Sequence, residues 1–85
     1  MNEIIKIFTE ITDQREMEKL FNEILTDKER SDINLRWQLM KELSDGMSQR
    51  DIASKYRISL CKITRGAKIL KNKRSICRKL INEKD

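Results

Sequence analysis

Basic and hydroxyl side chains recur at helical spacing between residues 60 and 71, where they could bind a nucleic acid. Lysine and arginine donate hydrogen bonds to phosphates and to the edge of guanine, whereas threonine offers a hydroxyl and a methyl group. A DNA-binding helix is one interpretation of this segment, and an ordinary helical hairpin with a solvated basic face is the alternative. The side chains expected to point outward are Cys61, Lys62, Thr64, Arg65 and Lys68.

The residues around this segment predict a helix-turn-helix over residues 48–71. Ser48 and Asp51 have the spacing of a capping box, in which the serine hydroxyl accepts from the backbone N–H three residues further on. A short helix follows, and then a tight turn over residues 57–59, in which Ser59 is expected to cap the second helix. The inward apolar positions of the two helices are Ile52, Ala53, Tyr56, Ile63, Ala67 and Leu70.

Apolar residues at intervals of three and four predict helices over the rest of the chain as well. Thr26 and Glu29 form another capping box, which opens the longest helix at about residues 27–45. Gly46 is expected to end that helix by taking the left-handed conformation. The chain has no proline and 2 glycines, so helix breakers are few, and we predict an all-α fold of about six short helices. The other three helices are expected at residues 2–11, around residues 17–25 and around residues 76–81.

Charge is distributed unevenly along the chain, whose net charge is +5. Residues 1–45 hold 7 basic and 11 acidic residues, a net charge of −4, whereas residues 46–85 hold 12 basic and 3 acidic residues, a net charge of +9. An acidic half followed by a strongly basic half is typical of a nucleic-acid-binding protein with a separate scaffold. A solvated basic face or an anionic membrane surface as partner would also fit this distribution.

Several other classes of protein are excluded by composition. The chain has no histidine and only two cysteines, so we expect no metal site and no acid–base catalytic group, and the chain is not expected to be an enzyme. No apolar run is long enough to span a membrane, and the N-terminus lacks the pattern of a signal peptide. We therefore expect a cytoplasmic protein in which Cys61 and Cys77 are reduced thiols.

The length of 85 residues predicts a single domain, of modest stability if it folds alone. The apolar stripe formed by Met17, Leu20, Phe21, Ile24 and Leu25 is more than one small chain can cover, which favours a homodimer. Within the domain we expect residues 1–45 to be mainly the dimerisation scaffold. Residues 46–71 form the helix-turn-helix, and residues 72–85 form a C-terminal helix.

Two short motifs resemble those of the Trp repressor family. Residues 47–53 are Met-Ser-Gln-Arg-Asp-Ile-Ala and residues 63–66 are Ile-Thr-Arg-Gly, similar to the "SQRE" and "ITRG" motifs of that family. Leu25-Thr26 with Glu29-Arg30, followed by Arg36, also resembles the family, so the similarity covers about residues 20–71. The resemblance implies an intertwined homodimer that binds operator DNA in successive major grooves and represses transcription.

The resemblance also implies which residues bind DNA and which bind a corepressor, L-tryptophan or a related small molecule. It places Gln49, Arg50, Ser59, Leu60, Cys61, Lys62, Thr64 and Lys71 against the DNA. It places Leu25, Thr26, Arg36, Arg65 and Gly66 in the ligand site, where the two arginines would flank an indole ring.

Three departures from the family pattern bear on these expectations. Arg57 stands where the turn usually has glycine, so a bulky residue is expected at positive φ. Ile69 replaces a serine that helps to hold the amino group of the ligand, and Trp37 replaces a small residue in the pocket floor. Because an indole side chain there competes with an indole ligand for volume, we expect L-tryptophan to bind weakly or not at all. Core packing is the simpler role for Trp37.

The sequence therefore predicts a DNA-binding transcriptional repressor of the Trp repressor type that binds double-stranded operator DNA as a homodimer. The alternative is a helical protein-interaction module with a solvated basic face and no role on DNA. Salt dependence of DNA binding separates the two hypotheses, because a protein that binds DNA releases counterions and therefore loses affinity steeply as the salt concentration rises.

Overall fold

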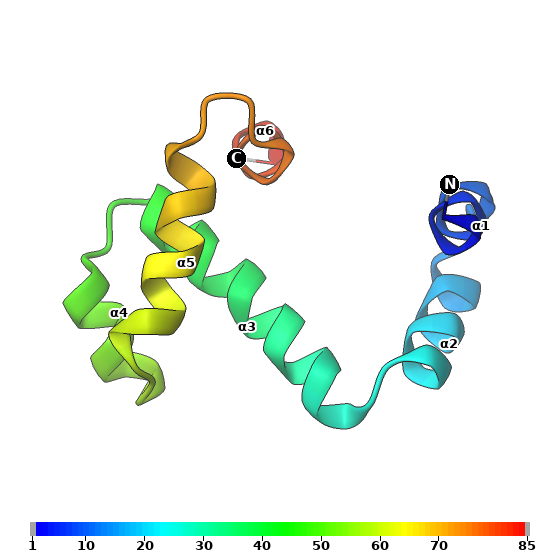
Figure 1. Ribbon diagram of the computed structural model, residues 1–85, viewed down its shortest axis with the longest axis horizontal. Helices are drawn as coiled ribbons and strands as arrows, with labels where there is room; N and C mark the ends of the chain where they lie inside the picture. Colours follow the sequence, from blue (N-terminus) through cyan, green and yellow to red (C-terminus); the bar gives the residue numbers. More distant parts are fainter. Residues whose placement is uncertain (1, 85) are drawn as a thin grey trace. The chain divides into compact units, whose positions relative to one another are not determined.

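The fold is entirely helical over residues 2–84, which are the residues that the computed structural model describes (Figure 1). It contains six helices and no strand within that range, as the sequence predicts. The observed boundaries lie within a few residues of the expected ones. The helices are α1 (Glu3–Glu10), α2 (Gln14–Ile24), α3 (Asp27–Ser44), α4 (Gln49–Tyr56), α5 (Leu60–Lys71) and α6 (Ile76–Lys84).

The chain divides into two compact units. Unit 1 comprises residues 1–32 and unit 2 comprises residues 33–85. Unit 1 contains α1, α2 and the beginning of α3, whereas unit 2 contains the remainder of α3 together with α4, α5 and α6. The predicted helix-turn-helix therefore lies wholly within unit 2.

Local hydrogen bonds define the helix boundaries of unit 1. The Asp13 side chain caps α2 by accepting from the backbone N–H of Arg15 at 3.0 Å. The predicted capping box at the start of α3 is present in both directions. The backbone N–H of Glu29 donates to Thr26 Oγ1 at 3.1 Å, and the backbone N–H of Thr26 donates to Glu29 Oε1 at 2.9 Å. The Arg30 guanidinium also donates to the Leu25 carbonyl at 2.5 Å.

Unit 1 has little apolar core. The rings of Phe8 and Phe21 lie with centroids 6.3 Å apart and planes tilted by 52°, so α1 and α2 contact each other through these two side chains. No residue of α1 or α2 within the described part of the chain is buried. Ile5, Ile7 and Ile24 are each more than a third exposed. Of the apolar stripe predicted from the sequence, Ile24 is exposed, whereas Met17, Leu20, Phe21 and Leu25 are only partly buried in the single chain.

The hydrophobic core lies in unit 2, where four helices contribute to it. Trp37 and Cys77 are partly buried and pack against this core, so the core-packing role expected for Trp37 is observed. Ile33, four residues before Trp37 on α3, is 40% exposed. The buried core side chains are Leu39, Met40, Ile52, Ile63 and Ile81.

A Schellman motif ends α3 and directs the chain into α4. Gly46 takes φ of +101° as expected, and its N–H donates to the Leu43 carbonyl at 3.0 Å. The N–H of Met47 donates to the Glu42 carbonyl at 3.0 Å, which completes the pair of bonds that defines the motif. A glycine is required here because other residues rarely adopt this conformation.

Candidate DNA-binding site

Helices α4 and α5 pack against each other as a helix-turn-helix. Ile52 on α4 and Ile63 on α5 are both 0% exposed, and Ala53 is half-buried beside them. The Ser48 hydroxyl caps α4 by accepting from the backbone N–H of Asp51 at 3.1 Å, as predicted. The position of α5 is therefore fixed by a packed apolar interface and not by surface contacts alone.

The turn between the two helices carries the one positive-φ residue other than glycine in the described range. Arg57 takes φ of +56° and ψ of +47°, the left-handed conformation expected where the family has glycine. Its backbone N–H donates to the Ala53 carbonyl, and the N–H of Ile58 donates to the same carbonyl at 3.2 Å. The turn geometry is thus kept although the residue type departs from the family pattern.

The expected capping role of Ser59 is wrong. Ser59 occupies the N-cap position of α5 with an extended backbone, but its side chain makes no capping hydrogen bond. Both Ser59 and the following turn of α5 are exposed to solvent, so water can satisfy the amides that the hydroxyl would otherwise serve. The first amides of α5 therefore remain accessible to an external acceptor such as a phosphate.

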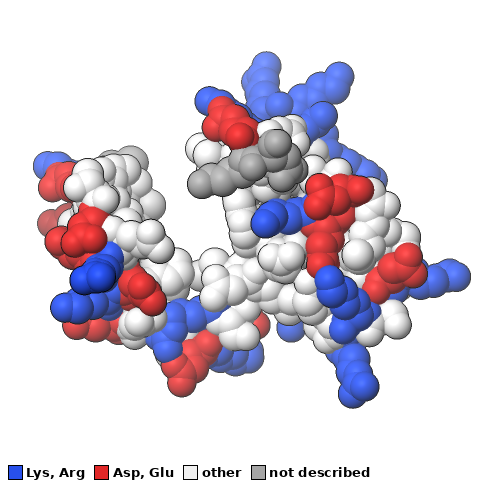
Figure 2. Space-filling view, turned by 180° about the vertical axis from the view of Figure 1, so that it is seen from behind, with Lys and Arg blue, Asp and Glu red and all other residues white. Residues whose placement is uncertain are grey.

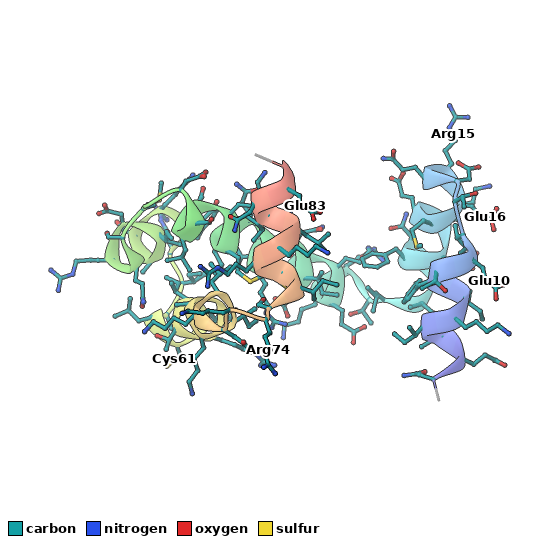
Figure 3. All side chains as sticks on the ribbon, turned by 90° about the horizontal axis from the view of Figure 1, so that it is seen from above. Glu10, Arg15, Glu16, Cys61, Arg74 and Glu83 are labelled. Carbon is teal, nitrogen blue, oxygen red and sulfur yellow. The ribbon has the colours of Figure 1, made fainter. Side chains whose placement is uncertain are left out.

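All the residues predicted to bind DNA are exposed on unit 2. Cys61 projects from the beginning of α5 (Figure 3). The Thr64 hydroxyl donates to the Leu60 carbonyl at 2.8 Å, so this side chain presents its methyl group and an acceptor oxygen outward and not a free donor. The exposed set is Gln49, Arg50, Ser59, Leu60, Cys61, Lys62, Thr64 and Lys71.

A buried carboxylate connects α3 to the helix-turn-helix, and sequence analysis missed it. Glu42 on α3 is only 8% exposed. Its Oε1 accepts hydrogen bonds from Lys55 Nζ at 2.5 Å and from the Tyr56 hydroxyl at 2.8 Å, both at the end of α4. Position 42 lies three residues after buried Leu39, on the inner face of α3. A charged residue on the inner face of a helix is the sequence signal that could have been used, because a buried charge requires a partner of opposite charge or a hydrogen bond.

The three groups of this network shift one another's proton affinity. The hydrogen bond from Lys55 holds the pKa of the Glu42 carboxyl below its ordinary value of 4.5, although burial opposes this. The same hydrogen bond raises the pKa of the Lys55 ammonium above 10.5. Burial, together with the hydrogen bond to Glu42, raises the pKa of the Tyr56 hydroxyl above 10.0. At neutral pH the network therefore consists of a carboxylate, an ammonium and a neutral phenol.

The residues predicted to bind a ligand are divided between the two units. In unit 1, Leu25 is half-buried and the Thr26 side chain is engaged in the capping box. In unit 2, Arg36 is half-buried on α3 and Arg65 is exposed on α5. Neither unit by itself contains the whole predicted ligand set.

Gly66 is the member of the ligand set whose surroundings are best defined. It is buried, and a Cβ added there would lie 2.7 Å from Leu39 Cδ1 and 3.1 Å from Met40 Cγ. These distances are below ordinary van der Waals contact, so the absence of a side chain lets α5 approach α3 closely. In unit 2 this glycine therefore serves helix packing.

The described residues offer neither a metal-binding cluster nor a membrane-spanning helix. Among residues 2–84, no group of three or more histidine, cysteine, aspartate or glutamate side chains could hold a metal ion. Both cysteines are free thiols, Cys61 exposed and Cys77 partly buried. Within the same range, none of the helices has the length and apolar character needed to cross a membrane.

The fold and the exposed basic helix define an all-α helix-turn-helix protein. The chain matches the family described as Trp repressor protein over residues 1–85. It therefore belongs to the Trp repressor family, a family of transcriptional repressors and not of enzymes, and the resemblance seen in the two motifs is confirmed.

Individual relatives agree with this assignment. The Trp operon repressor homolog of Chlamydia trachomatis serovar D is 39% identical over 56 residues, which cover 65% of this chain and 60% of the relative. The homolog from serovar A has the same identity and coverage. The matched part of the chain thus spans about 60% of the length of these relatives. No solved structure matches the chain.

Proposed function

We propose that this protein represses transcription by binding double-stranded operator DNA as a homodimer, with α5 in the major groove. The observation that carries the proposal is the outward face of α5, which is basic, exposed and held on α4 through Ile52 and Ile63. A recognition helix needs both properties, because its side chains must reach base edges from a fixed backbone.

Arg50 and Lys62 are the residues we assign to base recognition. Both are exposed, Arg50 near the beginning of α4 and Lys62 near the beginning of α5. The test is selection of a preferred duplex from a random library, followed by fluorescence anisotropy with Arg50→Ala and Lys62→Ala. Each substitution should cost about 1–3 kcal/mol and relax sequence preference. Lys19→Ala, which removes an exposed charge from unit 1, is the control.

Two outcomes would count against this assignment. Equal weakening on all sequences would make the substituted residue a phosphate contact and not a base contact. Binding that is insensitive to salt would contradict DNA binding altogether and favour a protein-interaction module, because neutralising phosphates releases counterions.

Dimerisation is supported by the uncovered apolar side chains of unit 1. Ile5, Ile7 and Ile24 are exposed and no residue of α1 or α2 in the described range is buried, so a second copy of the chain would remove this surface from water. Sedimentation equilibrium at micromolar concentration should give the mass of two chains. A folded monomer under those conditions would contradict the proposal.

A corepressor is the remaining part of the proposal, and L-tryptophan or a related small molecule is its expected class. Arg36 and Arg65 are suited to stack on an aromatic ring or to bind a carboxylate. Trp37 packs against the core, and we propose that its bulk restricts an indole ligand. Operator affinity measured with and without saturating L-tryptophan tests this. A gain of tenfold or more, about 1.4 kcal/mol of coupling, would show that the ligand binds, whereas Trp37→Val should create a response that the parent chain lacks.

A further inference from the structure

A second basic surface lies beyond the helix-turn-helix, at the turn from α5 into α6. The sequence contains no acidic residue between Asp51 and Glu83, and ten lysines and arginines lie in that interval. Blue side chains gather over the end of α5 and over α6 in Figure 2. We define the α5–α6 basic surface as four exposed residues of this region: Lys71, Lys73, Arg74 and Arg78.

The turn that carries these cations is held by its own hydrogen bonds. The N–H of Arg74 donates to Asn72 Oδ1 at 2.9 Å, and the N–H of Ser75 donates to the Asn72 carbonyl at 3.0 Å. The N–H of Arg78 donates to Ser75 Oγ at 3.2 Å, which caps α6. The backbone beneath the four cations is therefore ordered before any partner binds, so little backbone entropy is lost on binding.

The four residues of this surface differ from the neighbouring Lys79 in ion pairing. Lys79 Nζ lies 3.9 Å from Glu83 Oε1 on the same helix. Among the described side chains, none of the four members of the α5–α6 basic surface is ion-paired. Their charges are consequently available to an external anion.

Two members of the surface come from different helices and share one hollow. Lys71 on α5 and Arg78 on α6 both line a depression of about 490 Å³, together with Ser44, Leu70 and Asn82. Among the residues that the structure describes, no carboxylate lines it. Two cations around an open depression without a counter-charge are arranged to accept an anionic group such as a phosphate.

The surface is continuous with the recognition face of α5. Thr64, Lys68 and Lys71 follow one another at intervals of four and three residues, so they share one side of the helix. In Figure 3, Cys61 at the beginning of α5 and Arg74 after its end lie along the same side of unit 2. Lys71 therefore belongs both to the recognition face and to the hollow beside α6.

We infer that the α5–α6 basic surface binds the sugar-phosphate backbone of duplex DNA beside the bases contacted by α5. The inference rests on the proposed DNA-binding function and extends its footprint from the helix-turn-helix to the beginning of α6. Such contacts carry no sequence information, and they raise affinity for every duplex by releasing counterions.

The test is the salt dependence of binding to a fluorescent random-sequence duplex, measured by anisotropy with the full chain. Lys73→Gln, Arg74→Gln and Arg78→Gln are combined in one variant. For each phosphate that the variant no longer neutralises, the slope of log K against log[salt] should become shallower by about 0.9. The matched control combines Lys6→Gln, Arg15→Gln and Lys19→Gln, which remove the same charge from exposed positions of unit 1. The control should leave the slope near that of the parent chain.

Each outcome decides a separate point. A triple variant with the slope of the parent, or with the same change as the control, overturns the α5–α6 contact while leaving the proposed function intact. A parent chain that binds no duplex at low salt overturns the proposed function and this inference with it. Circular dichroism checks that both triple variants keep the helical content of the parent, as expected for substitutions at exposed sites.

Discussion

Lys55 and Glu42 lie on different helices, and the lysine ammonium donates a hydrogen bond to the buried carboxylate across 2.5 Å. The bond joins the end of α4 to α3, so the first helix of the helix-turn-helix is fixed to a helix that contributes to the core. Tyr56 adds a second hydrogen bond to the same oxygen at 2.8 Å. Orientation of α4 therefore depends on one charged group as well as on apolar packing.

Glu42→Gln should destabilise the protein by about 1–3 kcal/mol, the range for a buried polar group deprived of a charged partner. The amide can still accept from Tyr56, but it no longer attracts the ammonium of Lys55. Urea unfolding followed by circular dichroism measures the change. Glu29→Gln is a suitable control, because its amide oxygen can still accept the capping bond from Thr26 at an exposed site. Equal effects of the two substitutions would contradict a special role for Glu42.

Stability should also depend on pH through this network. The folded pKa of Glu42 is lowered, so its contribution is present above pH 4.5 and is lost as the pH falls through the folded pKa. The folded pKa values of Lys55 and Tyr56 are raised, so their contribution is present below pH 10.0 and is lost as the pH rises beyond it. Melting temperatures across the pH range test both signs. The Glu42→Gln protein should lose less stability than the parent on acidification, and identical acid profiles would contradict this assignment.

Gly66→Ala should destabilise unit 2 although alanine favours a helix by about 1 kcal/mol. The added Cβ would lie 2.7 Å from Leu39 Cδ1, and Leu39 is only 2% exposed, so its side chain has little room to move. Overpacking of this kind costs about 1–3 kcal/mol. The double variant with Leu39→Ala should be less destabilised than the sum of the two single variants, because the smaller residue makes space for the methyl group. Strict additivity in urea unfolding would show that the two sites do not interact.

Arg57→Gly should stabilise the protein or leave it unchanged, in contrast to most glycine substitutions. A residue other than glycine in the left-handed conformation is disfavoured by about 1–2 kcal/mol, which offsets the greater flexibility of glycine in the unfolded chain. Arg57 is exposed, so removing its side chain disturbs little packing. Arg57→Val is the control, for which the opposite effect is expected. It should lower the urea unfolding midpoint because β-branched residues avoid positive φ. A lower midpoint for the glycine variant would contradict a strained turn.

Structural features that depend on residues close together in the sequence could be predicted from the sequence. The Thr26 capping box and the Gly46 helix end each follow from residues within a few positions of one another, whereas the positive φ of Arg57 was expected from the family resemblance. Apolar periodicity placed Ile52 and Ile63 correctly in the core for the same reason. Helix boundaries and the exposed face of α5 were therefore predictable before the structure.

Features that depend on distant residues were not predictable in this way. The partners of Glu42 lie thirteen and fourteen positions away, and nothing in its immediate neighbours identifies them. The close approach at Gly66 depends on where α3 passes α5, which the neighbours of Gly66 in sequence do not indicate. The Ser59 cap is also absent, although Ser59 occupies the N-cap position of α5 and the equally exposed Ser48 does cap α4.

The uneven burial of apolar side chains affects how much of the chain stays ordered when the protein concentration is low. Among the described residues, all five buried hydrophobic side chains belong to unit 2, whereas α1 and α2 have none. Segments with few buried side chains open at low free-energy cost, and binding of a second copy shifts that opening by mass action. At low protein concentration the N-terminal helices would then fray before unit 2 unfolds.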